Sequence, residues 1–118
     1  MKLEPELIKE ILLWCEGHLP DDEKMWSASD IEIKGFESKQ IQFHTKLLFD
    51  NGYIDGESAN TLTSKDIDLN HLTMSGYQYL ELLRGKAWKT AKGIMYKVGV
   101  IFAEGAIKAI IDKTVTQM

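Results

Sequence analysis

Residues 37–54 read Glu-Ser-Lys-Gln-Ile-Gln-Phe-His-Thr-Lys-Leu-Leu-Phe-Asp-Asn-Gly-Tyr-Ile, and this stretch decides the fold of the chain. Four of its side chains are spaced by three or four positions, which places them on one face of a helix. These inner-face residues are Ile41, His44, Thr45 and Leu48. We therefore predict a central helix over residues 38–50. Ser38 is its expected N-cap, because a serine hydroxyl accepts a hydrogen bond from a free amide of the first turn.

The end of this helix predicts the element after it. Asn51-Gly52 tolerates the left-handed backbone that ends many helices, and Tyr53-Ile54 begins an extended segment. A helix that stops at a glycine and leads directly into a strand is typical of the recognition helix and wing of a winged helix-turn-helix domain. We therefore expect an α+β, winged-helix-like domain over residues 1–84.

Two segments precede the central helix. An apolar stripe behind Pro5, whose missing amide suits a first helical turn, predicts a helix that ends at Glu16. Residues 18–29 show no period and are expected to form a loop with at most one helical turn. The alternation Ile-Glu-Ile at 31–33 predicts a short strand. The second helix of a helix-turn-helix is then either reduced or supplied in a degenerate form by residues 19–30.

A β-hairpin wing is expected after the central helix. Turn residues occupy 55–58 and 64–66, and the segments beside them, 59–63 and 67–72, are predicted to form two antiparallel strands. Period-two alternation places three side chains of the second strand on one face, namely Ile67, Leu69 and His71.

Helical segments complete the chain. Thr73 is the expected N-cap of a helix over residues 74–84. The side chains predicted to face inward from it are Tyr77, Leu80 and either Leu82 or Leu83. Residues 85–118 are expected to form a C-terminal helical extension that packs on the domain or joins two chains into a homodimer.

Composition limits the class of protein. The chain has 118 residues, 44% of them hydrophobic, which suffices for one core. Cys15 is the only cysteine, so an internal disulfide and a multi-cysteine zinc site are excluded. Acidic residues interrupt the N-terminal segment where a secretory signal is apolar, and the C-terminal segment is too charged to span a membrane. A cytoplasmic location is therefore expected.

Charge is distributed unevenly along the chain, whose net charge is -4. Residues 1–36 hold 4 Lys against 9 acids, and residues 37–76 hold 3 Lys against 6 acids. Residues 77–118 hold 7 Lys and Arg against 3 acids. The part that looks like a DNA reader is thus acidic, which counts against simple duplex binding because phosphate neutralisation supplies most non-specific affinity.

Two motifs resemble a known family. The first has the form Ile-x-x-His-x-x-x-Leu followed by Gly, an apolar residue and Ile; the second has the form Leu-Thr-x-x-Gly-x-x-aromatic-Leu followed by Arg and Trp. In this chain they are Ile41, His44, Leu48, Gly52, Tyr53 and Ile54, then Leu72, Thr73, Gly76, Tyr79, Leu80, Arg84 and Trp88. Together they resemble the small bacterial and prophage proteins of domain of unknown function 2513.

The resemblance covers most of residues 5–92. Met74 stands where an aromatic residue is expected and Tyr53 where Leu is commoner, and both changes preserve bulk. The resemblance implies a winged-helix-like fold and a setting among prophages and other mobile elements. It implies no activity.

Two surfaces are candidates for binding. The outward face of the central helix is a candidate nucleic-acid site, formed by Lys39, Gln40, Gln42, Phe43 and Lys46. A basic group on the C-terminal segments is a candidate phosphate-binding patch, formed by Arg84, Lys86, Lys89, Lys92 and Lys97. Each also has a structural interpretation: the first is a solvated or protein-packed face, and the second is a helix edge whose Trp88 packs into the core.

Chemical sites are weakly indicated. A lone histidine on an inner face, His44, is expected to bond to backbone groups. Asp66 and Asp68 have the spacing of a metal pair, but strand parity points both to solvent, so no metal is expected. With no phosphate loop and no catalytic constellation, we expect neither enzymatic activity nor a cofactor.

Two functions are compatible with these patterns. The first is a prophage-associated DNA-binding or transcription-regulatory protein that binds double-stranded DNA. The alternative is a protein–protein interaction module that keeps the winged-helix scaffold without DNA binding.

Overall fold

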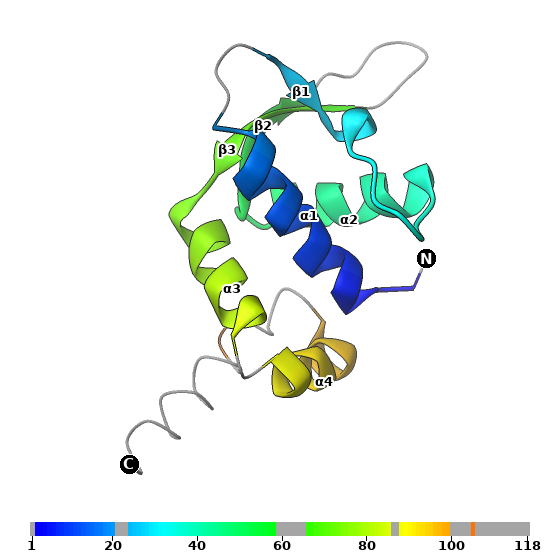
Figure 1. Ribbon diagram of the computed structural model, residues 1–118, viewed down its shortest axis with the longest axis vertical. Helices are drawn as coiled ribbons and strands as arrows, with labels where there is room; N and C mark the ends of the chain where they lie inside the picture. The colour runs from blue at the N-terminus through cyan, green and yellow to red at the C-terminus, as the bar shows by residue number, and fades with distance from the viewer. Residues whose placement is uncertain (1, 21–23, 59–65, 86–87, 100–104, 106–118) are drawn as a thin grey trace.

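The computed structural model describes residues 2–20, 24–58, 66–85, 88–99 and 105 (Figure 1). Within these residues the fold is α+β, with four α-helices and a small three-stranded antiparallel sheet, and it is consistent with the predicted winged-helix-like fold. The elements are α1 (Pro5–His18), β1 (Trp26–Ser27), the 3-10 helix η1 (Ala28–Asp30), α2 (Ser38–Asp50), β2 (Ile54–Ser58), β3 (Ile67–Leu72), α3 (Met74–Arg84) and α4 (Trp88–Val98).

Helix α1 is the centre of the domain. It crosses the middle of the molecule in Figure 1, with the sheet at one end and α4 at the other, and it packs on α2, α3, α4 and β3. Its predicted apolar stripe is fully buried, because Leu7, Ile8, Ile11 and Leu12 point into the core that these elements share. The helix runs two residues past its predicted end.

The prediction of a strand at residues 31–33 is wrong, because these residues form no strand in the structure. The strand that precedes α2 is β1, which pairs with β3 through Trp26 opposite Leu69. A capping box between Ser27 and Asp30 then forms the N-terminus of η1. Ile31 is buried beyond it, so the alternation of apolar residues reflects loop packing. Residues 28–30, within the predicted segment 19–30, form the 3-10 helix η1, which packs on α2.

Helix α2 has its predicted bounds but a different cap. Glu37 is the N-cap, because its carboxylate accepts from the backbone amide of Gln40 while the Gln40 side chain accepts from the Glu37 amide at 3.0 Å. The Ser38 hydroxyl accepts instead from Gln42 Nε2. This reciprocal capping box satisfies two free amides, whereas Ser38 as cap satisfies one. Gly52 ends the helix with a φ of 81°, as predicted.

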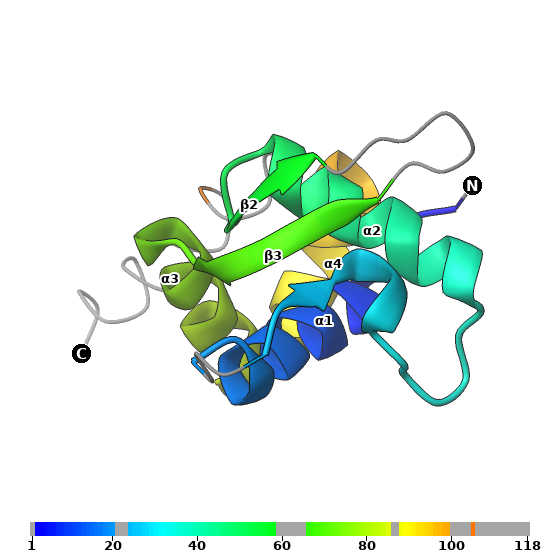
Figure 2. The ribbon, with the colours of Figure 1, turned by 90° about the horizontal axis from the view of Figure 1, so that it is seen from above.

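The sheet has the order β1-β3-β2, so β2 and β1 are its edges (Figure 2). The strand predicted at residues 67–72 is confirmed, but its partner is β2 over 54–58, where a turn was predicted. Gly56 is not a turn residue. A Cβ at this position would lie 2.3 Å from the Asp68 carbonyl oxygen, so only glycine allows this approach. The predicted strand at 59–63 lies outside the described residues.

A bulge in β3 corrects the predicted face of this strand. Gly56 pairs with Leu69 and Asp55 with His71, so Asn70 has no residue opposite it. The extra residue reverses the parity of the residues after it. Leu72 is therefore buried, and His71, which was predicted to lie beside Ile67 and Leu69, is exposed.

Helix α3 has its predicted bounds, and the Thr73 hydroxyl caps it by accepting from the Gly76 amide at 3.0 Å. Leu80 and Leu83 are buried as predicted, but Tyr77 is 40% exposed and Tyr79 is buried in its place. The Tyr79 ring packs against Tyr53, with centroids 4.9 Å apart.

Helix α4 packs on α1 and α3 through Ala91 and Met95, which are fully buried. Residues 100–104 and 106–118 of the expected C-terminal extension lie outside the residues that the structure describes.

Candidate functional site

His44 is a structural residue, as predicted. It is fully buried, and each ring nitrogen contacts a backbone group. Its Nε2 accepts from the Glu4 amide at 2.9 Å, so its Nδ1 carries the proton and donates to the Gln40 carbonyl at 2.7 Å. Burial lowers the pKa of this imidazole and favours its neutral form. His44 thereby ties the start of α1 to the inner face of α2.

The outward face of α2 is open but largely uncharged. Lys46 donates to Asp50 at 2.6 Å, and this ion pair within the helix neutralises it. Gln40 belongs to the cap and Gln42 donates to Ser38. Lys39 is exposed and forms no ion pair with any residue that the structure describes.

Phe43 and the sheet form a groove beside this face, which we call the α2–β2 groove. It has a volume of about 370 Å³ and lies between α2, from Gln42 to Asp50, and the ends of β2 and β3 at Ser58 and Ile67. Its apolar lining consists of Ala28, Phe43, Phe49 and Ile67. Its polar lining consists of Gln42, Lys46, Asp50, Ser58 and Asp66. Phe43 is 42% exposed, which leaves much of its ring open to a ligand.

Charge around this groove is not cationic. Asp50 balances Lys46, and Asp66 lies on the opposite wall, where it accepts from the Ser29 hydroxyl at 2.6 Å. On the outer side of β2, Asp55 and Glu57 are exposed. A surface that presents more acids than lysines attracts phosphate poorly.

Two members of the predicted basic patch, Arg84 and Lys92, form ion pairs with acidic residues of α1. Arg84 donates to Glu16 of α1 and lies 3.2 Å from Glu81. Lys92 of α4 donates to Glu6 of α1 at 2.5 Å. This hydrogen bond raises the pKa of Lys92 and lowers the pKa of Glu6.

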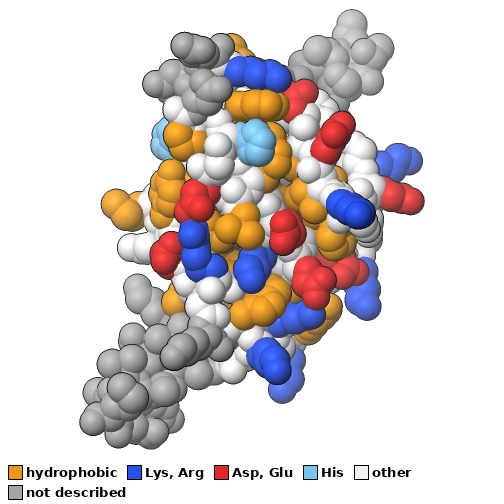
Figure 3. Space-filling view, viewed as in Figure 1, with side chains coloured by type: hydrophobic (Ala, Val, Ile, Leu, Met, Phe, Trp, Pro, Cys, Tyr) orange, Lys and Arg blue, Asp and Glu red, His pale blue; other side chains and the backbone are white. Residues whose placement is uncertain are grey.

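The remaining members of the basic patch are isolated. Lys89 and Lys97 are exposed and form no ion pair with a described residue, and Lys86 lies outside the described part of the chain. Figure 3 shows basic and acidic side chains next to one another on the face that carries α1 and α4. The structure therefore separates the predicted phosphate patch into ion pairs and two isolated lysines.

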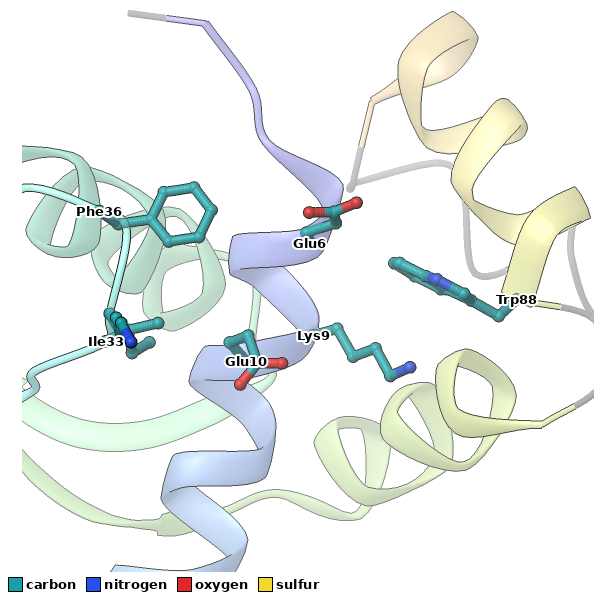
Figure 4. A pocket seen from close by; sticks show the side chains of 7 residues that line it. Glu6, Lys9, Glu10, Ile33, Phe36 and Trp88 are labelled. Carbon is teal, nitrogen blue, oxygen red and sulfur yellow. The ribbon is translucent and has the colours of Figure 1, made fainter.

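A second hollow of about 460 Å³ lies over α1 (Figure 4). Ile33 and Phe36 form one side and Trp88 the other, while Glu6, Lys9 and Glu10 project from α1 between them. Lys9 Nζ lies 4.5 Å from the centre of the Trp88 ring, a cation–π contact between α1 and α4.

Trp88 is half-buried and packs against the core, in agreement with its structural interpretation. Lys9 and Glu6 in this hollow already have partners in α4, so they hold the two helices together.

Titratable clusters are sparse. Asp68 accepts from the Ser27 hydroxyl at 3.0 Å, which occupies one oxygen of the spaced aspartate pair. Among the described residues, no group of three or more His, Cys, Asp or Glu side chains is placed to hold a metal ion. Cys15 is buried, and burial raises the pKa of its thiol to about 12, so it stays protonated.

Sequence reasoning found half of the α2–β2 groove. Phe43 and Lys46 were predicted on the outward face of α2, but the opposite wall was missed. That wall, which includes Ser58 and Ile67, depends on the register of β2 with β3. Phe49 carried a weak signal, as a second aromatic residue near the end of the same helix.

Comparisons with known proteins identify relatives without an assigned activity. The sequence model of a family described as "Hypothetical protein (DUF2513)" matches residues 2–101. An "Uncharacterized protein" of Haemophilus influenzae is 27% identical over 119 residues, which cover 100% of this chain and 98% of that protein. No solved structure matches the chain. Within the described part, every helix is too short or too polar to cross a bilayer.

Proposed function

Because the chain belongs to the DUF2513 family of hypothetical proteins, whose name assigns no activity, we propose its function from its surface. We propose that it is a protein-interaction module on a winged-helix-like scaffold, without enzymatic activity, and that the α2–β2 groove is its binding site. A cytoplasmic location is part of this proposal.

One observation carries the proposal: the surface beside α2 offers an exposed aromatic ring where a DNA reader offers cations. Phe43 is 42% exposed in the α2–β2 groove beside the apolar side chains of Phe49 and Ile67, while Lys46 is paired with Asp50. Aromatic side chains in concave, partly desolvated sites dominate the energetics of protein interfaces. Non-specific binding of duplex DNA instead depends mainly on Lys and Arg side chains that neutralise phosphates.

DNA binding by a prophage-associated regulator is the second candidate. It is favoured by the open outward face of α2, where Lys39 is free of ion pairs among the described residues. In this alternative, Lys39 and Lys46 contact phosphates, Gln42 reads base edges, and β2 and β3 flank the duplex.

Salt-dependent duplex binding separates the two candidates. The full chain is titrated against a labelled mixed-sequence duplex of about 20 base pairs at low and at physiological salt. The interaction module is expected to show no measurable binding at physiological salt. Tight binding that falls with salt and is lost in the double variant Lys39→Glu, Lys46→Glu supports the DNA reader and contradicts the interaction module.

Affinity capture tests the groove directly. Tagged wild type, Phe43→Ala and the matched control Tyr77→Ala are used as baits, since Tyr77 is an aromatic residue of α3 that is 40% exposed outside the groove. We expect one protein that wild type and Tyr77→Ala retain and Phe43→Ala loses. A set of captured proteins that is the same for all three baits contradicts the proposal.

A homodimer through the C-terminal helical segment is a further part of the proposal. Tyr96 and Val98 of α4 are 51% and 44% exposed, which supports a second contact surface there. Sedimentation equilibrium of the full chain is expected to give twice the mass of one chain. A monomer at all concentrations removes the dimer and leaves the groove untouched.

A further inference from the structure

The unpaired outer edge of β2 indicates which kind of ligand the α2–β2 groove would bind. We propose that the groove binds an extended peptide of a partner protein, which adds a strand to β2 and alternates apolar with basic side chains. This inference rests on the proposed function and deepens it, since it names the chemistry of the partner.

The backbone of β2 supplies the first part of the site. β2 is an outer strand of the order β1-β3-β2, and only its inner edge is paired, with β3 (Figure 2). Among the described residues, 55–58 form no backbone hydrogen bond beyond the sheet. Alternate residues of an antiparallel edge strand direct amide and carbonyl groups away from the sheet, where an added strand satisfies them.

The inner face of β2 supplies the pocket for apolar side chains. Ile54, Gly56 and Ser58 point to this side, because they pair with Leu72, Leu69 and Ile67, which are buried. Ser58 lines the α2–β2 groove opposite Phe43 and Phe49. A strand added beyond β2 therefore directs every second side chain toward the two phenylalanine rings.

The outer face of β2 selects the charge of the partner. Asp55 and Glu57 point to this side, and Glu57 lies opposite Asp68 of β3. His71 lies 3.4 Å from Asp55, but Glu57 has no ion pair among the described residues. The remaining side chains of an added strand lie beside these acids, where Lys or Arg is favoured.

The same acids argue against a second copy of this chain at this edge. Two antiparallel β2 strands centred on Gly56 bring Asp55 of one copy beside Glu57 of the other. Like charges in adjacent strands destabilise the pair. β1 is a poor alternative for strand addition, since it has two residues. The ligand is therefore a segment of another protein.

Binding of a defined probe tests the inference. The full chain is titrated by fluorescence anisotropy against a labelled peptide of about seven residues that alternates Val and Lys. Two control peptides are used: one N-methylated at the alternate amides that would face β2, and one with Asp in place of Lys. We expect saturable binding of the first peptide only.

Variants of the chain locate the binding site. Phe43→Ala is expected to weaken binding about tenfold, as for an anchoring aromatic residue, and Tyr77→Ala to leave it unchanged. Glu57→Lys is expected to invert the preference from the Lys peptide to the Asp peptide. Glu10→Lys, an equal change of charge on the exposed side of α1, is the matched control and is expected to keep the wild-type preference.

Each other outcome overturns the inference. Equal binding of the N-methylated peptide excludes strand addition, an unchanged affinity in Phe43→Ala excludes the groove, and an unchanged preference in Glu57→Lys excludes the charge rule. Absence of binding by wild type excludes all three. In that case a captured protein that still depends on Phe43 preserves the proposed function, whereas salt-sensitive duplex binding removes both.

Discussion

Two surfaces of this protein were predicted to carry cations, and they handle charge differently. On the surface that α1 shares with α3 and α4, Arg84 of α3 reaches Glu16 and Lys92 of α4 reaches Glu6, partners that are 68 and 86 residues away in the chain. On the α2 surface, Lys46 pairs with Asp50 one turn further along the same helix. The ion pairs of the first surface join different helices. The ion pair of the second surface lies within α2 and leaves its outward face open beside the α2–β2 groove.

This difference shows that the net charge of a sequence segment does not predict the net charge of the surface on which that segment lies. Residues 77–118 are basic and residues 1–36 are acidic, but the fold brings α4 against α1 and so mixes the two. Residues 37–76 have a net negative charge, and among the described residues no Lys or Arg of another segment lines the α2–β2 groove. The large side chain that stays exposed on α2 is Phe43, whose value to a partner is hydrophobic.

The largest expected effect is the difference in the free energy of unfolding between a variant at Met95, which is buried under the first surface, and a variant at Phe43, which is exposed on the second. Met95→Ala is expected to lower the free energy of unfolding by about 2–5 kcal/mol, because it leaves a cavity between α4, α1 and α3. Phe43→Ala is expected to change it by less than about 0.5 kcal/mol. Urea denaturation of both variants measures the difference. Equal losses would mean that the groove is part of the core and not a binding site.

The next effect concerns the inner face of α2, and it depends on pH. The buried imidazole of His44 has a pKa below its ordinary value of 6.5, so the unfolded chain binds more protons than the folded chain in this window. Stability is therefore expected to fall as pH is lowered from about 6.5 to the folded pKa of His44, and His44 adds no further loss below it.

Urea denaturation at about pH 7.5 and about pH 5.5 measures this dependence. His44→Gln is expected to be less stable at the higher pH by about 1–3 kcal/mol, since its side chain leaves a buried backbone group without a partner. It is also expected to lose part of the pH dependence. His71→Gln, at an exposed histidine of β3, is the matched control. A pH dependence that is the same in wild type and His44→Gln would show that another group is responsible.

Local signals were enough to predict the helices. The bounds of α2 and α3 follow from apolar spacing together with Gly52 and Thr73, because these residues act within one turn of themselves. The role of His44 was predictable for the same reason, since its spacing places it on the inner face of α2. The Ser38 prediction failed because two local caps competed, and the box of Glu37 with Gln40 satisfies more amides.

Long-range pairing decided the features that the sequence could not predict. β1 is a strand because Trp26 and Ser27 lie beside Leu69 and Asp68, which no local pattern indicates. Gly56 looks like a turn residue until the approach of the Asp68 carbonyl is known. The α2–β2 groove depends on this same register, so its outer helix was predictable and its opposite wall was not.

The smallest expected effect tests whether an ion pair stabilises the contact between α3 and α1. Arg84→Gln removes a guanidinium that lies beside both Glu16 and Glu81, and is expected to lower the free energy of unfolding by about 0.5–1 kcal/mol at low salt, as exposed ion pairs do. The loss is expected to shrink in about 1 M NaCl, where charges are screened within about 3 Å. Lys89→Gln removes an equal charge from an exposed site without an ion pair to a described residue and is expected to have no effect. If both variants lose the same free energy of unfolding, the net charge of the chain accounts for the change and the contact with α1 does not. The two surfaces would then differ only in that Met95 is buried and Phe43 is exposed.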